Sequence, residues 1–180
     1  MIVGLAPGRR GGDRTGVPFY GDRSGDRLRI ALGASAARVY ITNVVKCAPK
    51  TCDGAQRVPP SDRAFDGQRG GCILDGRRCR VKNRDPRPDE IRNCAPFLAA
   101  ELRWVRPRGI LALGRVAERA VNEALGRDVA PSAAGVLNGE DPFVAYLPHP
   151  ASLHFHPRWN RAFDTGLAAI LEAAAVTGPR

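Results

Sequence analysis

The sequence predicts an α/β fold of three layers, in which a central four-stranded parallel sheet lies between two layers of helices. Four short runs are almost wholly apolar or rich in β-branched and aromatic residues, as buried strands are, at residues 1–4, 38–43, 109–114 and 143–147. Amphipathic segments alternate with these runs, which favours parallel strands covered by helices on both faces. At 180 residues the chain is long enough for one domain with a substantial core.

Four helices are expected between and after the strands, at residues 23–32, 89–104, 116–125 and 158–176. Asp22 or Ser24 is predicted to cap the first of them. Pro96 lies inside the second, so we expect that helix to begin late or to kink there. The residues expected to face the core from the second and fourth helices are Ile91, Cys94, Leu98, Leu102, Phe163, Leu167, Ile170 and Leu171.

The segment of residues 51–86 has no usable periodicity and is rich in Arg, Gly, Pro and Asp. We interpret it as a loop inserted into the single domain of residues 1–180, since long loops of this kind are usually functional or ordered by a ligand. The insertion holds Cys52, Cys72 and Cys79, and Cys47 and Cys94 flank it. Five cysteines in a chain without a signal-peptide pattern favour metal or cluster binding over disulfides.

The net charge of +10 favours an anionic polymer as the partner, and nucleic acid is preferred to a membrane surface because no basic amphipathic anchor is visible. A GC-rich genome also raises the arginine content, so the charge supports a functional argument without carrying one. No apolar run approaches 20 residues, and we therefore expect a cytoplasmic protein.

A glycine-rich loop follows the first predicted strand, between about residues 4 and 26. It is not a phosphate-binding P-loop, because no Gly-Lys-Ser/Thr follows it. It is not a dinucleotide fingerprint either, because the glycine spacing is wrong and Pro7 removes one of the amides such a loop would use. Its glycines, its aromatic pair and its acids predict a pocket for a flat, uncharged ring beside a phosphate track.

Specific motifs then indicate a family. Gly-Leu-Ala-Pro-Gly at residues 4–8 and Phe-Tyr-Gly-Asp-Arg-Ser-Gly-Asp at residues 19–26 are followed by Thr-Asn-Val-Val-Lys-Cys at residues 42–47 and His-Pro-Ala-Ser at residues 149–152. This set resembles the uracil-DNA glycosylase superfamily, in particular its families 4 and 5. Leu5 is the family 5 form, where family 4 has Glu, whereas Gly8 and Pro18 look more like family 4. The resemblance is therefore closest to family 5.

The resemblance implies a DNA-repair enzyme that flips uracil, or another deaminated base, out of DNA and hydrolyses its N-glycosidic bond. Phe19 would stack on the base, and its alternative reading is a core residue beneath the loop. Asn43 would pair with N3–H and O4 of uracil and mismatch cytosine, and its alternative is an asparagine that ends a strand. The other base-binding candidates are Gly4, Leu5, Ala6 and Tyr20. Tyr20 would shape the pocket so that the methyl group of thymine does not fit.

Three residues are the catalytic candidates. His149 would donate a hydrogen bond, as a neutral imidazole, to O2 of the departing uracil anion. Asp22 would orient water and stabilise the oxocarbenium-like sugar, a part that Leu5 cannot take, and capping a helix is its equally supported alternative. Asn43 completes the set through its contact with the base.

DNA contacts are expected from arginines, from the start of a helix and from the segment after His149. The candidates are Arg9, Arg10, Arg14, Gly114, Arg115, Ser152 and Leu153. Leu153 would be the wedge that fills the vacated stack, and Ser152 or the Gly114-Arg115 pair would replace the serine hydroxyl that Ala151 lacks. The expected partners are double- and single-stranded DNA that contains uracil, and we expect a monomer.

Two alternatives stay open at this point. Hypoxanthine or xanthine could be the base that is removed, which the size of the pocket would decide. The protein could also be a damage- or single-strand-binding module that kept the fold and lost turnover, because Leu5 and Ala151 depart from the family pattern.

The resemblance also implies a structural [4Fe-4S] cluster on four cysteines. Cys47 and Cys94 match two of its ligands, while the other two lie upstream of the first motif in the family and have no match here. Either the start is truncated or the insertion supplies substitutes, and we assign Cys72 and Cys79 to that part. Zinc or a metal-free form remains the alternative, because these cysteine spacings are not diagnostic.

Overall fold

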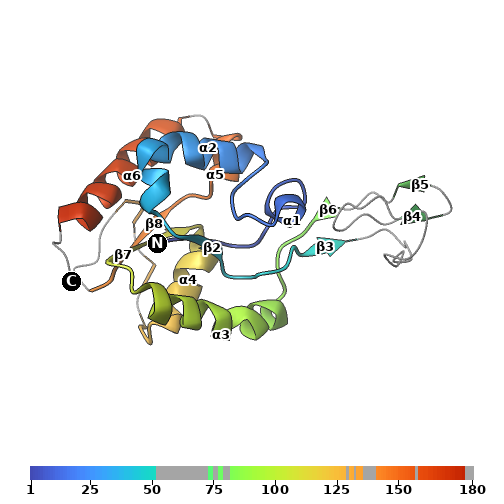
Figure 1. Cartoon of the computed structure of the whole chain (residues 1–180), viewed down its shortest axis with the longest axis horizontal. Helices are drawn as coiled ribbons and strands as arrows, with labels where there is room; N and C mark the ends of the chain where they lie inside the picture. Colours follow the sequence, from blue (N-terminus) through green and yellow to red (C-terminus); the bar gives the residue numbers. More distant parts are fainter. Residues whose placement is uncertain are drawn as a thin grey trace.

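A computed structural model describes residues 1–51, 73–74, 77–78, 82–128, 130–131, 133–135, 141–156 and 158–176 of the chain. The four predicted strands form one parallel sheet in the order β2-β1-β7-β8 (Figure 1). Their bounds are Ile2–Gly4 for β1, Ile41–Asn43 for β2, Gly109–Leu113 for β7 and Phe143–Leu147 for β8. The prediction of a four-stranded parallel sheet is confirmed.

Helices cover both faces of this sheet (Figure 1). One face packs against α2 (Arg23–Leu32), α5 (Pro150–Leu153) and α6 (Trp159–Val176). The other face packs against α3 (Pro88–Val105) and α4 (Arg115–Ala124). Successive residues of a strand point to opposite faces, so β7 sends alternate side chains into two separate cores and is buried throughout. The three-layer prediction is therefore confirmed.

The helix faces expected to pack inward do so. Leu98 and Leu102 of α3 are buried in one core, and Ile91 and Cys94 pack against it. In the other core, Phe163, Leu167 and Ile170 of α6 are buried, and the half-buried Leu171 packs against them.

Two short helices lie where the sequence predicted loop or strand. The one-turn helix α1 (Gly12–Thr15) is part of the glycine-rich loop, where we expected no helix before about residue 24. The 3-10 helix η1 (Gly33–Arg38) follows α2, so β2 begins at Ile41 and not at residue 38. Gly33 has φ 50° and ends α2, and the small residues after it permit the tighter turn.

The helix α3 does not begin late, although it contains Pro96. Its start is fixed by Pro88, whose missing N–H is not needed in the first turn, and by Glu90, whose carboxylate accepts from the Arg87 N–H at 2.8 Å. The carbonyl deprived of a partner by Pro96 belongs to Arg92, an exposed residue that water can reach.

Part of the inserted segment is ordered into paired strands. β3 (Lys50–Thr51) pairs antiparallel with β6 (Lys82–Asn83), and β4 (Ile73–Leu74) pairs with β5 (Arg77–Arg78). The expectation of a segment without secondary structure is wrong at these positions. The chain that leaves along β3 comes back along β6, and the two strands form an antiparallel pair. The predicted ligands Cys72 and Cys79, and Cys52 with them, lie outside the described residues.

None of the helices in the described part of the chain is both long enough and apolar enough to cross a membrane.

Candidate active site

A cavity of about 340 Å³ opens where the carboxyl ends of the strands meet, a size typical of small-molecule sites. The strand order places the topological switch point between β1 and β7, where open α/β sheets bind their ligands. The sequence-predicted residues that line this cavity come from the ends of β1, β2 and β8 and from the glycine-rich loop: Leu5, Ala6, Phe19, Asp22, Asn43 and His149.

Phe19 forms a wall of the cavity and also belongs to the core beneath it, with 9% of its surface exposed. Its backbone has φ 51°, in the left-handed region that is unfavourable for a bulky residue. The carbonyl of Phe19 accepts from Nε of Arg29 at 2.8 Å, and Gly25 lies so close that a Cβ there would strike that carbonyl. Contacts from the first turn of α2 (Gly25) and from its last turn (Arg29) therefore hold Phe19 in its strained conformation.

Asn43 ends β2 and is 4% exposed. Its Oδ1 finds no hydrogen-bond donor among the described residues. A buried polar atom without a partner is unfavourable by about 1–3 kcal/mol, so such atoms in native proteins usually have a reason to be unpaired. Because Asn43 lines the cavity, its carboxamide is available to the edge of a bound ring.

His149 lies at the end of β8, with its ring centroid 5.5 Å from that of Phe19. Nδ1 of His149 accepts from the Ala151 N–H at 3.1 Å, so in the neutral ring the proton is on Nε2. Burial lowers the pKa of His149, and the nearby Asp22 carboxylate opposes that shift. The imidazole is therefore neutral at pH 7 and can donate from Nε2.

Asp22 caps a helix and also lines the cavity, the two positions that its alternative roles require. Its Oδ1 accepts from the Gly25 N–H at 2.9 Å and caps α2, so Asp22 and not Ser24 is the N-cap. The residue also lines the cavity, and its Oδ2 is the atom nearest to where Cβ atoms would lie on Gly8 and Gly11. A single carboxylate can thus cap the helix with one oxygen and face the cavity with the other.

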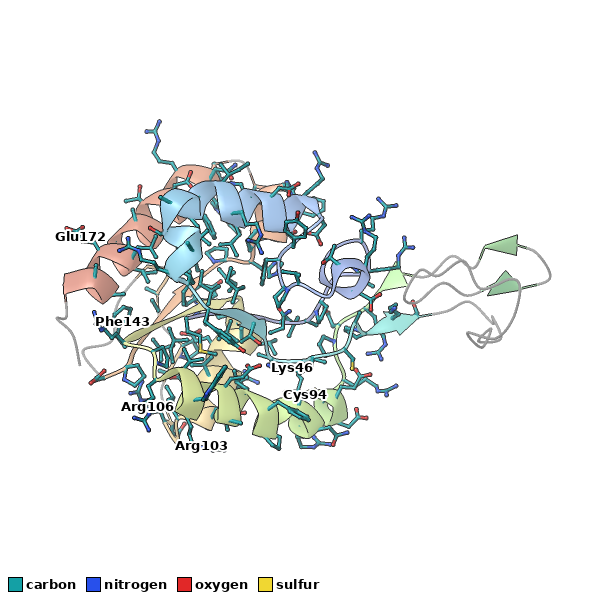
Figure 2. The ribbon with its side chains drawn as sticks, viewed as in Figure 1. Lys46, Cys94, Arg103, Arg106, Phe143 and Glu172 are labelled. Atoms are coloured by element: carbon teal, nitrogen blue, oxygen red, sulfur yellow. The ribbon has the colours of Figure 1, made fainter. Side chains whose placement is uncertain are left out.

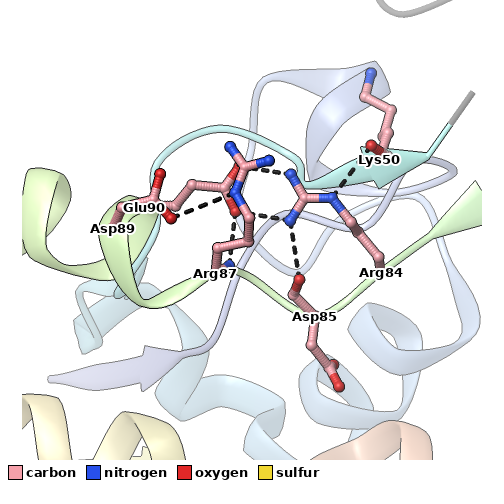
Figure 3. Close-up of polar contacts among 6 residues, drawn as sticks. All are labelled: Lys50, Arg84, Asp85, Arg87, Asp89 and Glu90. Atoms are coloured by element: carbon pink, nitrogen blue, oxygen red, sulfur yellow. Dashed lines mark hydrogen bonds and ion pairs between the residues drawn. The ribbon is translucent and has the colours of Figure 1, made fainter.

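A second wall of the cavity consists of Pro49 and of residues 83–86, the last part of the inserted segment. The Arg84 guanidinium pairs with both oxygens of Glu90 and donates to the carbonyl of Lys50 at 3.3 Å (Figure 3). Hydrogen bonds from Arg84 and from the backbone of Arg87 lower the pKa of Glu90 to about 2. The one feature of the sequence that could have indicated this wall is Arg84, six residues before Glu90 of the capping box.

Two of the predicted contacts are wrong. Leu153 is 2% exposed and packs in the core, because one turn of α5 turns it inward, so it cannot be the wedge in this structure. Tyr20 is 53% exposed and is not among the residues that line the cavity. The Arg29 guanidinium carbon instead lies over the Tyr20 ring, 5.1 Å from its centroid.

Three of the predicted DNA contacts have partners within the protein. Arg14 donates to two carbonyls of the glycine-rich loop. Arg115 lies over an aromatic ring of β8 and pairs with a glutamate one turn along α4. The Ser152 hydroxyl donates to the His149 carbonyl at 2.6 Å. Their roles in DNA binding stay predictions, as do those of Arg9, Arg10 and Gly114.

Of the predicted metal ligands, Cys47 is exposed and Cys94 is half-buried, and both are free thiols. In the described ranges no group of three His, Cys, Asp or Glu side chains is placed to hold a metal ion. The described residues thus provide two of the four cysteines that a cubane cluster needs.

The protonation of His149 predicts a pH profile. The rate of any step that uses the neutral ring as a donor should fall towards low pH with a midpoint below about pH 6.5, the ordinary histidine pKa, because burial lowers the pKa of His149. A proton on Nδ1 would displace the Ala151 N–H and add a charge. The native state binds that proton less readily than the unfolded chain, so stability also decreases as the pH falls below 6.5.

Single-turnover rates at saturating enzyme measure this profile. The Asp22→Asn variant provides a check, because it removes the charge that raises the pKa of His149 and should move the acid limb to lower pH. An acid limb centred at or above pH 6.5 in the wild type would contradict the assignment.

The fold and the pocket define a class of protein, a three-layer α/β protein with a cavity at the switch point of its parallel sheet. The chain belongs to the uracil DNA glycosylase superfamily, whose family model matches residues 1–171. This confirms the resemblance on which the site residues were chosen.

Relatives of both expected types are found. The chain is 34% identical over 192 residues to a Type-5 uracil-DNA glycosylase of Pyrobaculum aerophilum, covering 97% of this chain and 70% of the relative. It is 30% identical to a Type-4 uracil-DNA glycosylase of the same organism, covering 93% of this chain and 74% of the relative. A Type-5 uracil-DNA glycosylase of Mycobacterium bovis is 37% identical over 118 residues, covering 63% of this chain and 37% of the relative.

Proposed function

We propose that this protein removes uracil from DNA by hydrolysing its N-glycosidic bond, which leaves an abasic site. The observation that carries the proposal concerns Asn43, whose buried Oδ1 has no hydrogen-bond partner in the described part of the chain and lies in a cavity that Phe19 and His149 also line. An aromatic face, an edge-reading amide and a neutral donor are what recognition of an extrahelical pyrimidine requires.

In the bound state the flipped base stacks on Phe19 and presents its pairing edge to Asn43. The uracil N3–H donates to Oδ1, and the carboxamide N–H groups donate to O4. Cytosine has an amino donor at position 4 and an unprotonated N3, so neither of these bonds forms with it. The same atom that is unfavourable when the cavity is empty thus selects the base when the cavity is filled.

Cleavage breaks the bond between C1′ of the sugar and N1 of uracil, and the electron pair leaves with the base. His149 stabilises the anion by donating from Nε2 to O2. The open oxygen of Asp22 stabilises the cationic sugar and orients the water that adds to C1′. That water loses one proton to bulk solvent and leaves its hydroxyl on the abasic sugar.

The test is an oligonucleotide with one uracil, incubated with the protein and then treated with alkali. Strand scission at the uracil is expected, and the same strand with thymine or cytosine should stay intact. Parallel strands with hypoxanthine and xanthine define the range of bases. Tight binding of the uracil strand without scission would favour a binding module and contradict the proposal.

Phe155, and not Leu153, is the wedge that fills the vacated stack in this proposal. It lies two residues beyond Leu153 in the turn after α5 and is 81% exposed. A wedge must be exposed in free protein and apolar, and a benzyl group satisfies both conditions. Phe155→Ala should therefore slow excision from duplex DNA about 10-fold, equivalent to about 1.4 kcal/mol, and leave excision from single strands within about 2-fold.

The measurement compares single-turnover rates on duplex and single-stranded substrates. His154→Ala is the matched control, because His154 is an exposed residue of the same turn. Equal losses on both substrates would assign Phe155 to the fold and not to the vacated stack.

The proposal extends to a structural [4Fe-4S] cluster with Cys47 and Cys94 as two of its ligands. Support comes from their placement, on the turn after β2 and on α3, which such a group would join. Protein purified without oxygen should be brown and contain iron and acid-labile sulfide, and Cys94→Ser should lose both. A colourless wild type that contains zinc would contradict the cluster.

A further inference from the structure

Lys46 makes three short contacts just beyond the end of β2. Its Nζ donates to the main-chain carbonyl of Asn43 at 2.6 Å, to the Thr42 hydroxyl at 2.9 Å and to the Glu101 carboxylate at 2.7 Å. The Thr42 hydroxyl in turn donates to the other oxygen of Glu101 at 3.2 Å. All three N–H groups of the ammonium thus donate hydrogen bonds, and one of these bonds is made to Asn43, the residue proposed to recognise the base.

These contacts tie the end of a strand to a helix. Glu101 lies on α3, and Figure 2 shows Lys46 beside that helix, below the sheet. The side chains of Lys46 and Glu101 are 26% and 22% exposed, so the pair is partly shielded from solvent. Tyr40 belongs to the same surroundings, although it is exposed: partial desolvation of its hydroxyl and the charge and hydrogen bond of the Glu101 carboxylate raise its pKa.

No side chain in the described ranges is hydrogen-bonded to Oδ1 of the Asn43 carboxamide. The position of this group therefore depends on the main chain that carries it. On the β1 side that main chain is fixed by the parallel pairing of Gly4 with Asn43 and by the Val44 N–H, which donates to the Gly4 carbonyl at 2.8 Å. On the α3 side the Asn43 carbonyl is held by Lys46.

We propose that Lys46 is a positioning residue. Anchored by Glu101, it fixes the main chain of Asn43 so that the Asn43 carboxamide reaches the pairing edge of the bound base. The proposal rests on the proposed function of the pocket. A displacement of about 1 Å at a reacting site lowers rates up to about 100-fold, so loss of this tie should lower the rate of excision without removing any group that touches the base.

The competing explanation is that the ion pair only stabilises the fold. A matched pair exists for comparison: Arg27 of α2 contacts Asp164 of α6 at 2.6 Å, and neither residue lines the cavity. Both pairs join two elements of the fold and have partly exposed side chains. Only the Lys46 pair also binds the backbone of Asn43, so only its loss should depend on the presence of the Asn43 side chain.

The experiment is a double-mutant cycle in single-turnover uracil excision, with protein in excess over the oligonucleotide. Lys46→Met should lower the rate constant about 10- to 30-fold in the wild-type background and less than about 2-fold in the Asn43→Ala background. Lys46→Arg, which keeps the charge and its reach, should recover most of the rate. Arg27→Met should change the rate less than about 2-fold in both backgrounds.

Equal losses from Lys46→Met in both backgrounds, or a loss that Arg27→Met reproduces, would overturn the positioning role. If Lys46→Met shows no cooperative thermal transition, Glu101→Gln takes its place in the cycle, because it loosens the anchor and keeps the bond to Asn43. The proposed function is tested separately by the wild-type rate and by Asn43→Ala alone. A wild type that leaves uracil in place would defeat the function, whereas additivity in the cycle would defeat only the role of Lys46.

Discussion

Replacing Asn43 by alanine is expected to lower the rate constant for uracil excision about 10²- to 10³-fold, with little change in the affinity for undamaged DNA. The substitution removes an acceptor and two donors that are already in place and largely shielded from water, with 4% of the residue exposed. Single preorganised groups in such sites contribute effects of this size. Single-turnover kinetics with protein in excess measure the rate constant without interference from product release.

Asn122 provides the control. It is also a buried asparagine, 6% exposed, and its Oδ1 likewise has no partner among the described residues, but it lies on α4 and does not line the cavity. Asn122→Ala should change stability in a similar way and leave the rate within about 2-fold. If Asn43→Ala retains the wild-type rate, Asn43 does not read the base and the site must be reassigned.

The sheet and its strand tips could be predicted because they depend on period and composition. Residues 143–147 are apolar throughout and form β8 with the predicted bounds, and residues 23–32 form α2 with the predicted bounds. Once the strands are parallel and in one sheet, the residues that follow them must meet at one edge. That geometric constraint brought Phe19, Asn43 and His149 into one cavity.

The direction of a side chain after a strand could not be predicted in this way. Leu153 and Phe155 are both apolar residues in the segment after His149, and only the turn of α5 decides that the first is buried and the second exposed. Tyr20 lies beside Phe19 in sequence but outside the cavity, because Phe19 takes a left-handed backbone conformation. These outcomes depend on local dihedral angles that residue types alone do not determine.

The second wall of the cavity was missed for a different reason. Residues 83–86 follow a segment without periodicity, and their position depends on the contacts of Arg84 with Glu90 and with the carbonyl of Lys50. Those contacts join Arg84, near the end of the insertion, to Lys50 before it and to Glu90 after it, and no periodic pattern indicates contacts of this kind.

Replacing Gly4 by alanine is expected to abolish most of the excision activity, with a fall of at least about 10²-fold and a loss of about 1–3 kcal/mol in the free energy of unfolding. A Cβ on Gly4 would lie 2.5 Å from two ring carbons of Phe19 and 2.6 Å from Oδ1 of Asn43. The Phe19 ring is packed in the core and the Asn43 carboxamide is buried, so the added methyl group must push both from their positions and disturb the packing around them. One added methyl group thus displaces both surfaces that are proposed to contact the base.

Gly126→Ala separates this effect from general destabilisation. Gly126 has φ 70°, which alanine adopts with strain, and apart from its chain neighbours no described residue has an atom within 4 Å of the added Cβ. The variant should therefore lose about 1 kcal/mol and keep its excision rate. Thermal unfolding and single-turnover excision are measured on both proteins. A Gly4→Ala protein that is destabilised but excises uracil at the wild-type rate would show that Phe19 and Asn43 can separate without consequence, and the pocket would then not be the site of base recognition. The opposite result, a folded protein that binds DNA and leaves uracil in place, follows only if catalysis depends on the spacing between the aromatic face and the amide edge.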